Sequence, residues 1–532
     1  MEANYPKYVL YGLLIVGSWL LSCLLHFQAF HLSLFPYPST LLSRRVVLPL
    51  ALDASFLPPP DDAAGVGDGA AQRISRKSSS PSSVAAKGAA SSCEGRYVHM
   101  LEVPSRFDML SGCVEGSPAF EDPYHVCVLM SNSGLGPVIP PGNSSDNADI
   151  IPSTGWYNTD QYALEVIFHN RMRRYECLTG DLAVATAVYV PFYPALELNR
   201  HKCGSSATER NVPSMEFLRW LSSQPSWAAL GGRDHFIIAA RTTWMFRREE
   251  AGDALGCGNS FLVQPESGNM TVMTYESNIW ERRDFAVPYP TYFHPSSAGD
   301  VVAWQDRARA ADRPWLFAFA GARRANGTLA IRDHIIDECT ASPPRRCGML
   351  DCSHGLEGSI TCRSPRRLVA LFASARFCLQ PPGDSFMRRS SIDTIIAGCI
   401  PVFFHEASTF RKQYRWHERD VGEDSNADAA TGTDHRRYSV LIDPDDVVEG
   451  RVRIEEILSR FTDDEVIAMR EEVIKMIPRF VYKDPRVSFE GDMRDAFDIS
   501  FDEIMGRMRR IKNGDVIGWK EDGDDDVVTK DS

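Results

Sequence analysis

Motifs of several common enzyme classes are absent from this sequence of 532 residues. It contains no GxSxG, Walker or HExxH motif, so the α/β-hydrolase, P-loop and zinc-protease classes have no support. No two cysteines are spaced as CxxC, and no internal repeat is visible. Positive charge is also in deficit, and the formal net charge of −13 argues against a general nucleic-acid binder.

Long apolar runs are equally scarce, and one near the N-terminus stands out. Residues 8–25 are apolar and uncharged, which is long enough to span a bilayer. We therefore predict an uncleaved signal anchor over 8–28, preceded by a cytosolic tail at 1–7. A cleaved signal peptide is the alternative interpretation.

The remainder of the chain has features of a protein that matures in an oxidising lumen. Of the 13 cysteines, all but Cys23 follow the apolar run, which leaves an even number for disulfide bonds. Three glycosylation sequons also follow it, at Asn143, Asn269 and Asn326. We expect a single-pass type II membrane protein whose body is lumenal.

One cysteine-rich segment has two interpretations. Cys339, Cys347, Cys352 and Cys362, with His354 between them, are residue types that bind zinc. Without a CxxC pair, and in an oxidising compartment, disulfides explain them better, although the sequence does not give the pairing.

The body consists of two successive α/β sets. A flexible stem rich in Pro, Ala, Gly and Ser is predicted at 29–92, followed by one set at 93–310 and another at 311–480. Helices at 481–515 and an acidic disordered tail at 516–532 complete the chain. Alternation of strands and helices predicts parallel sheets with crossover helices. Strands are expected at 97–103, 182–190, 234–240, 315–320 and 438–442, and helices at 162–174, 215–221, 331–338, 452–460, 463–477 and 492–511.

The stretch 377–404 is the most informative, because its pattern predicts a strand, a turn, a helix and a second strand. Asp384 and Ser385 are residue types that cap the start of a helix. A strand–turn–helix unit with a glycine such as Gly383 in its turn is where α/β proteins bind phosphate groups.

Charged residues at this helix start have two explanations. Arg388 and Arg389 lie where the helix dipole disfavours cations unless an anion binds there. A local ion pair between Arg389 and Asp393, one turn apart, is the simpler explanation. We favour a nucleotide diphosphate held by the arginines, with Asp393 accepting from the ribose hydroxyls. Cys378 and Cys399 flank the helix, and we expect at least one to be simply buried.

A second acidic motif, Asp443-Pro-Asp445, follows an expected strand and has the spacing of a metal-binding DxD motif. We interpret it as a polar loop, because nothing nearby supplies a shell for magnesium or manganese. No metal or other cofactor is expected.

Together these segments resemble a known family. SARFCLQPPGDSFMRRSSIDTIIAGCIPVFF is similar to the signature of the exostosin-type glycosyltransferases of family 47, and most similar to plant xyloglucan galactosyltransferases. The resemblance continues through GRYVHMLEVPSRF, TGWYNTDQYALEVIFHNRMRRYECLTGD, VYVPFY, GRDHFIIAARTTWMFRR, VPYPTYFHP, WLFAFAGARR and VIKMIPRFVYKDPR. It implies a Golgi enzyme of the GT-B type, with two doubly wound Rossmann-like domains facing a cleft. It also implies an inverting transfer from a UDP-sugar without a metal.

The resemblance further implies roles for individual residues. The positions that would bind the nucleotide sugar are Gly321, Arg323, Gly383, Asp384, Ser385, Arg388, Arg389 and Asp393. Trp156 and Asp160 would face the acceptor, and His169 and Glu165 are candidates for the base. One departure is Phe386-Met387, where relatives usually have an aromatic residue followed by Thr, so a hydroxyl is missing from the phosphate turn.

Three functions remain open. The first is transfer of galactose from UDP-galactose, in a β-linkage, to xylosyl side chains of xyloglucan or a related hemicellulose. The second is a related transfer from UDP-galacturonate or UDP-arabinose. The third is a catalytically silent protein of the Golgi membrane that supports complexes of other Golgi glycosyltransferases. No nucleic acid partner is expected.

Overall fold

The computed structural model describes residues 93–140, 150–201, 203–248, 256–277, 284–323, 330–353, 358, 361–418 and 435–515. These residues belong to one compact unit, Lys87–Ser532. The predicted anchor, stem and acidic tail lie outside the described residues, as do Asn143, Asn326 and His354. Among the described helices, none is long and apolar enough to cross a membrane.

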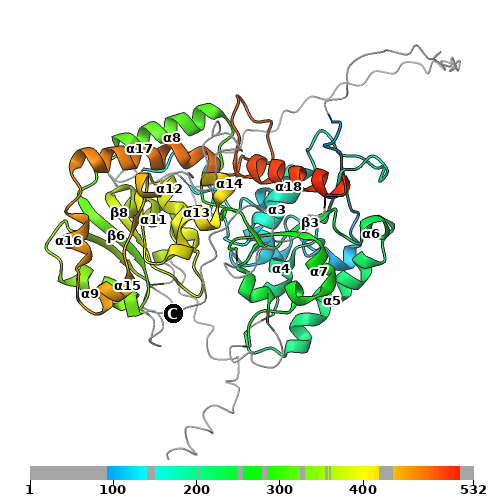
Figure 1. Cartoon of the computed structure of the whole chain (residues 1–532), viewed down its shortest axis with the longest axis horizontal. Helices are drawn as coiled ribbons and strands as arrows, with labels where there is room; N and C mark the ends of the chain where they lie inside the picture. Colours follow the sequence, from blue (N-terminus) through cyan, green and yellow to red (C-terminus); the bar gives the residue numbers. More distant parts are fainter. Residues whose placement is uncertain are drawn as a thin grey trace, which may run out of the picture. The chain divides into compact units, whose positions relative to one another are not determined.

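The first half of this unit is built on a parallel sheet with the strand order β1-β2-β3-β4-β5 (Figure 1). Its strands are β1 (Val98–Met100), β2 (Ala187–Tyr189), β3 (His235–Ile238), β4 (Thr271–Thr274) and β5 (Asp284–Ala286). The strands β2 to β5 are buried throughout, as expected for a parallel sheet covered on both faces. The strand order shows no reversal, so strand order does not support the expected doubly wound arrangement in this half.

The second half contains a parallel sheet with the order β10-β9-β8-β6-β7. Its strands are β6 (Trp315–Gly321), β7 (Cys347–Asp351), β8 (Ala375–Gln380), β9 (Ile400–Phe403) and β10 (Val440–Leu441). Here the order reverses between β6 and β8, as in doubly wound sheets. Such a reversal opens a crevice at the carboxyl ends of the two strands, which is where these sheets bind ligands.

The helices between the strands confirm the predicted alternation. Those of the first half are α2 (Val126–Leu129), α3 (Leu164–Met172), α4 (Pro194–Asn199), α5 (Ala207–Ser222), α6 (Pro225–Leu230) and α7 (Pro265–Asn269). Those of the second half are α8 (Ala298–Ala310), α9 (Ala330–Ala341), α11 (Pro365–Ala373), α12 (Arg389–Ile396), α13 (Phe410–Gln413), α14 (Arg415–Glu418), α15 (Pro444–Val448), α16 (Ile454–Leu458) and α17 (Asp463–Phe480). Helices α8 and α17 lie side by side next to α12 (Figure 1).

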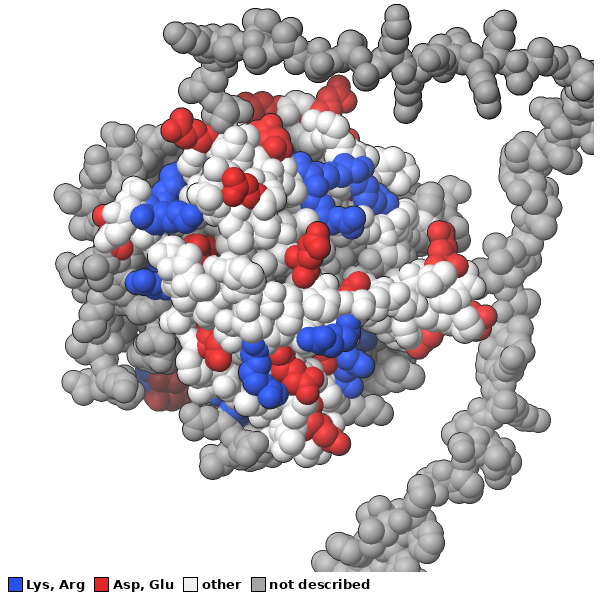
Figure 2. Space-filling model, turned by 90° about the vertical axis from the view of Figure 1, so that its right-hand side faces the viewer, with Lys and Arg blue, Asp and Glu red and all other residues white. Residues whose placement is uncertain are grey.

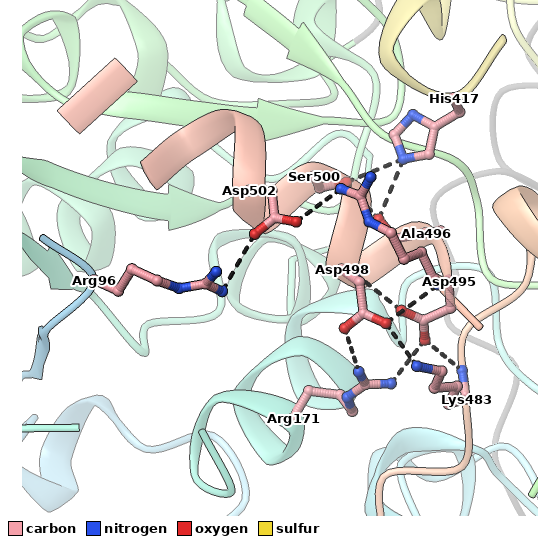
Figure 3. A network of polar contacts seen from close by, with 10 residues as sticks. Arg96, Arg171, His417, Lys483, Asp495, Ala496, Asp498, Ser500 and Asp502 are labelled. Carbon is pink, nitrogen blue, oxygen red and sulfur yellow. Dashed lines mark hydrogen bonds and ion pairs between the residues drawn. The ribbon is translucent and has the colours of Figure 1, made fainter. Parts of the chain in front are cut away.

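The last described helix, α18 (Ala496–Lys512), follows the second half in sequence but packs on the first half. The ring of Phe497 lies 4.5 Å from that of Phe168 on α3, measured between centroids. Arg171 of α3 pairs with Asp495 at 2.7 Å and with Asp498 at 2.8 Å (Figure 3). The acidic N-terminus of α18 is therefore anchored to α3 by a largely buried ion-pair network.

Six disulfide bonds use all the cysteines of the described region. They join Cys93–Cys177, Cys113–Cys127, Cys203–Cys257, Cys339–Cys347, Cys352–Cys362 and Cys378–Cys399. The disulfide interpretation of the cysteine-rich segment is confirmed. The expectation that Cys378 or Cys399 is simply buried was wrong: both are buried, but β8 and the residue before β9 lie close enough for the two sulfurs to bond.

Charge on the molecular surface is mixed. On the face drawn in Figure 2, Lys and Arg side chains lie among Asp and Glu side chains, and the described residues show no broad field of one sign there. Steering of a charged polymer to a surface requires a broad area of one charge sign.

Candidate active site

The turn after β8 leads into a helix as predicted, but this helix starts later than expected. α12 begins at Arg389 with Arg388 as its N-cap, so Asp384 and Ser385 do not cap it. These two residues belong to a preceding turn, closed by a 2.9 Å hydrogen bond from the N–H of Gly383 to the carbonyl of Ser385. The two arginines therefore lie directly at the helix start, as predicted.

A buried arginine that the sequence analysis missed lies very close to Gly383. A Cβ atom at Gly383 would lie 2.7 Å from Nη2 of Arg332, which belongs to α9 and is buried. Arg332 also donates through Nε to the carbonyl of Pro382 at 3.0 Å. The turn thus approaches a buried guanidinium so closely that only glycine fits without a shift.

A carboxylate from the first half reaches this turn. Glu276 follows β4, is 5% exposed, and accepts a 2.7 Å hydrogen bond from the N–H of Met387. Burial raises the pKa of Glu276 to about 7, although hydrogen bonds from Met387, Ser385 and Phe386 act to lower it. Sequence reasoning missed Glu276 because β4 was not predicted; the available signal was an acidic residue directly after a short apolar run.

The side chain of Met387 lies in the hydrophobic core. It is 1% exposed. The turn keeps a hydroxyl at Ser385, which donates to the carbonyl of Met387 at 3.1 Å. The departure from the family pattern at Met387 therefore places a thioether in the core.

Arg389 contacts both halves of the unit. Its Nη1 donates to the carbonyl of Thr159 at 2.6 Å, and its guanidinium lies 3.8 Å from the ring centroid of Tyr292. Its Nε is 3.8 Å from Asp393, so the predicted local ion pair exists but is long. Within the part of the chain that the structure describes, Nε and Nη2 are buried and lack hydrogen-bond acceptors, which leaves them available for an anion.

Asp393 is the buried partner of that arginine. It is 3% exposed, and burial raises its pKa to about 6 while the charge of Arg389 acts to lower it. This carboxyl group therefore lies one helical turn after the arginine that begins α12.

Gly321, the last residue of β6, and Arg323, which follows it, each have close neighbours within the second half. A Cβ at Gly321 would lie 2.4 Å from the ring of Phe319 on the same strand. The Arg323 side chain pairs with Asp337 and, at 3.9 Å, with Asp333, both on α9. Arg323 is therefore engaged on α9, whereas Arg388 and Arg389 stand at the start of α12.

Glu165 and His169, the predicted bases, do not act as a pair in this geometry. The Glu165 carboxylate is 1% exposed and accepts from the backbone N–H groups of Ala195 at 2.8 Å, Leu196 at 3.3 Å and Ala240 at 3.0 Å. Burial raises its pKa to about 8. It joins the start of α4, which follows β2, to the segment after β3.

His169 is directed elsewhere. Its Nδ1 lies 2.6 Å from the hydroxyl of Tyr193. Burial lowers the pKa of His169 to about 4, and the charge of Arg173 adds to this effect. A neutral imidazole bonded to a tyrosine positions the loop after β2.

Of the two expected acceptor residues, only Asp160 lies near the arginines. Trp156 is 1% exposed, with its ring packed against Phe293 and Trp304, so it cannot stack on a sugar. Asp160 follows Thr159, whose carbonyl accepts from Arg389, and its own carboxylate accepts from the N–H of Tyr162 at 2.8 Å. Asn269, the one described sequon, is exposed.

The acidic motif at Asp443 is confirmed as a polar capping loop. The Asp443 side chain accepts from the N–H of Asp445 at 2.9 Å and caps α15. Over the described ranges, no cluster of three or more His, Cys, Asp or Glu side chains has the geometry of a metal site.

Comparison with known proteins now places the chain in a class. The profile of the Exostosin GT47 domain matches residues 92–458, and the chain belongs to this family. It is 39% identical over 434 residues to xyloglucan galactosyltransferase MUR3 of Arabidopsis thaliana, covering 81% of this chain and 65% of that protein.

Two further relatives from Arabidopsis thaliana differ in their named sugar. The probable xyloglucan galactosyltransferase GT15 is 38% identical, with 80% of this chain and 84% of that protein covered. The xyloglucan-specific galacturonosyltransferase 1 is 35% identical, with 79% of this chain and 58% of that protein covered. The chain therefore spans about two-thirds or less of the length of some of these relatives and most of the length of others.

Proposed function

We propose that this protein is a Golgi glycosyltransferase that moves galactose from UDP-galactose to xylosyl side chains of xyloglucan. Support for the substrates comes from the relatives named xyloglucan galactosyltransferases, which are similar over about four-fifths of the chain. Support for the chemistry comes from one observation: Glu276 of the first half contacts the anion-binding turn of the second.

The proposed architecture is of the GT-B type, with the nucleotide on the second half. The diphosphate binds at the turn 383–387 and at the start of α12, where N–H groups, Arg388 and Arg389 converge. Asp393 accepts from the ribose hydroxyls. The acceptor approaches from the first half, on the side of Asp160.

The proposed reaction is a single inverting displacement. An acceptor hydroxyl oxygen forms a bond to the anomeric carbon as the bond from that carbon to the β-phosphate oxygen breaks. The electron pair leaves with the diphosphate, whose charge the arginines and N–H groups stabilise, with no metal required.

Glu276 accepts the proton in this scheme and replaces Glu165 and His169 as the base. Its pKa of about 7 suits proton transfer near neutrality. When the diphosphate takes over the N–H groups of the turn, Glu276 loses hydrogen bonds that lower its pKa and becomes a stronger base. Donor binding and base activation are thereby coupled at one turn.

The disulfide framework supports residence in an oxidising compartment, and we place the protein in the Golgi membrane through its N-terminal apolar run. A transfer assay tests the function. The full-length chain is given xyloglucan oligosaccharides and a panel of UDP-sugars, with and without EDTA, and product masses are read.

Each outcome of this assay selects one function. A hexose added from UDP-galactose in the presence of EDTA supports the proposal. Addition of a uronic acid or a pentose moves the enzyme to another donor, a possibility favoured by the galacturonosyltransferase among the relatives. A folded chain that neither transfers nor hydrolyses any donor points to a supporting role in complexes.

A further inference from the structure

Arg241, a residue with no assigned role so far, lies next to Glu276 at the edge of the first sheet. Its carbonyl accepts from the N–H of Tyr275 at 3.1 Å, and Thr242 pairs with Glu276 in a parallel bridge. The loop after β3 and the loop after β4 are thus neighbours. Because Glu276 contacts the N–H of Met387, the loop that carries Arg241 is connected through Glu276 to the turn proposed to hold the donor.

The Arg241 side chain is held in position by two contacts. Its guanidinium lies 4.4 Å from the ring centroid of Tyr162, and its Nη2 donates to the side-chain carbonyl of Asn199 on α4. Its Nε is buried and has no acceptor among the residues that the structure describes. The guanidinium is thus held on two sides and keeps one buried N–H group that could donate to an anion.

Buried Glu165 fixes the backbone on which this arrangement depends. One of its oxygens accepts from the N–H of Ala240, the residue before Arg241, at 3.0 Å. The same oxygen accepts at 2.8 Å from the N–H of Ala195, in the helix that carries Asn199. Glu165 therefore ties together the two segments that orient the Arg241 guanidinium.

A buried tyrosine links Arg241 electrostatically to the N-cap of α12. The buried phenol of Tyr289 interacts electrostatically with Glu276, Arg241 and Arg388. Arg388 is the N-cap of α12, and Arg241 comes from the first sheet. The charges of Arg241 and Arg388 therefore act on one buried side chain from the two halves.

We propose that Arg241 binds the diphosphate of the nucleotide sugar from the first half, opposite Arg388 and Arg389. This inference rests on the proposed use of a nucleoside-diphosphate donor, and it is independent of which sugar is transferred. A diphosphate bound in this way is contacted from both halves, so its binding brings the acceptor side and the donor side together.

The test is the affinity of the purified full-length chain for UDP, measured by calorimetry. Arg241→Gln removes the charge and is expected to weaken UDP binding about tenfold or more, since charge-assisted hydrogen bonds have that value. Arg200→Ala is the matched control: the Arg200 side chain is 61% exposed at the end of α4 and pairs with Glu197. Its UDP affinity is expected to stay within about twofold of wild type.

Further variants separate binding from folding. Arg241→Lys keeps the charge but loses the planar fork, and Asn199→Ala removes only the contact that orients the guanidinium; both are expected to weaken UDP binding less than Arg241→Gln. UDP affinity unchanged in folded Arg241→Gln, or in Arg241→Lys and Asn199→Ala together, would overturn the proposal. A wild-type chain that binds UDP but transfers no galactose contradicts the sugar assignment alone, and one that binds no UDP contradicts both.

Discussion

The carboxylate of Glu276 lies 2.7 Å from the backbone nitrogen of Met387, which joins the end of β4 in one half to the turn before α12 in the other. This contact spans 111 positions of sequence. It brings a carboxyl group that titrates near neutrality to the turn that has the features of an anion site.

The role of Glu276 as a base predicts a loss of turnover without a loss of donor binding. Glu276→Gln is expected to lower the rate of transfer about 100-fold or more, because the amide cannot accept the proton. UDP affinity is expected not to fall, since Glu276 makes no contact with the diphosphate in this scheme and the substitution removes a negative charge beside the anion. Rates and calorimetric affinity check this, with Glu266→Gln on α7 as a control; a variant with wild-type turnover would remove Glu276 from the mechanism.

The same group predicts the pH dependence of transfer. Glu276 accepts a proton only when it is ionised, and its pKa is raised to about 7, so the rate is expected to rise as the pH increases through that value. Rates at donor concentrations well below KM report the ionisation of the free enzyme. Measured from pH 5 to 9 in overlapping buffers, they would show this limb in the wild type. The residual activity of Glu276→Gln should lack it.

The raised pKa of Glu165 predicts that the free energy of unfolding also depends on pH. Its pKa is raised to about 8 in the folded state and is about 4.5 in the unfolded chain, so the folded state binds the extra proton between these values. The contribution of Glu165 to the free energy of unfolding is therefore full below about pH 4.5 and falls as the pH rises toward 8. Denaturant titrations at several pH values should show this fall in the wild type and its absence in Glu165→Gln.

Glu165→Ala should lower the stability of the fold more than Glu165→Gln does. Glu165→Ala leaves three buried N–H groups without their acceptor and is expected to cost about 3 kcal/mol or more of stability. Glu165→Gln keeps an oxygen for the two shorter hydrogen bonds and should cost less than about half of that. Equal losses in the two variants would mean that packing, and not the hydrogen bonds, sets the contribution.

Substitution of Arg389 distinguishes a catalytic role of the protein from a supporting role. Arg389→Ala removes the buried N–H groups proposed for the diphosphate and is expected to weaken UDP binding about tenfold or more and to abolish transfer. Arg376→Ala, an exposed arginine paired with Asp463, is the control. The variant and the wild type are each expressed in cells that lack the protein. If Arg389→Ala restores xyloglucan structure as fully as the wild type, the supporting role is favoured.

The bond between Cys378 and Cys399 underlies α12 and should matter for stability. Replacing both residues with serine is expected to lower the free energy of unfolding by about 2–4 kcal/mol, since the bond closes a loop of 21 residues. Thermal unfolding with and without a reductant, and peptide mapping of the intact bond, check this. An unchanged melting temperature in the double variant would show that the bond is not formed in solution.

Much of the fold was predictable because local patterns determine it. The apolar stripe of α12 and the buried runs of β3, β6 and β9 each occupy a continuous stretch of sequence. The carboxyl end of β8 followed by a glycine turn was sufficient to predict an anion site there.

The remainder depended on contacts between distant segments. Glu276 could not be predicted, because β4 has four residues and its partner Met387 lies in the other half. Glu165 was predicted as a base through the family resemblance, but the N–H groups that hold it belong to the start of α4 and to the segment after β3. Spacing along one helix indicates which residues share a face, and it does not reveal what that face meets.

The return of α18 to the first half has a consequence for biosynthesis. Arg171 cannot meet Asp495 and Asp498 until the last part of the chain has left the ribosome, because 324 positions separate the first two. The face of α3 against which Phe497 packs stays uncovered during translation, so this half is exposed to chaperones for the longest time. Truncation before α18, even at the end of the matched family domain, would remove a buried layer of the first half and trap the nascent protein in an incompletely folded state.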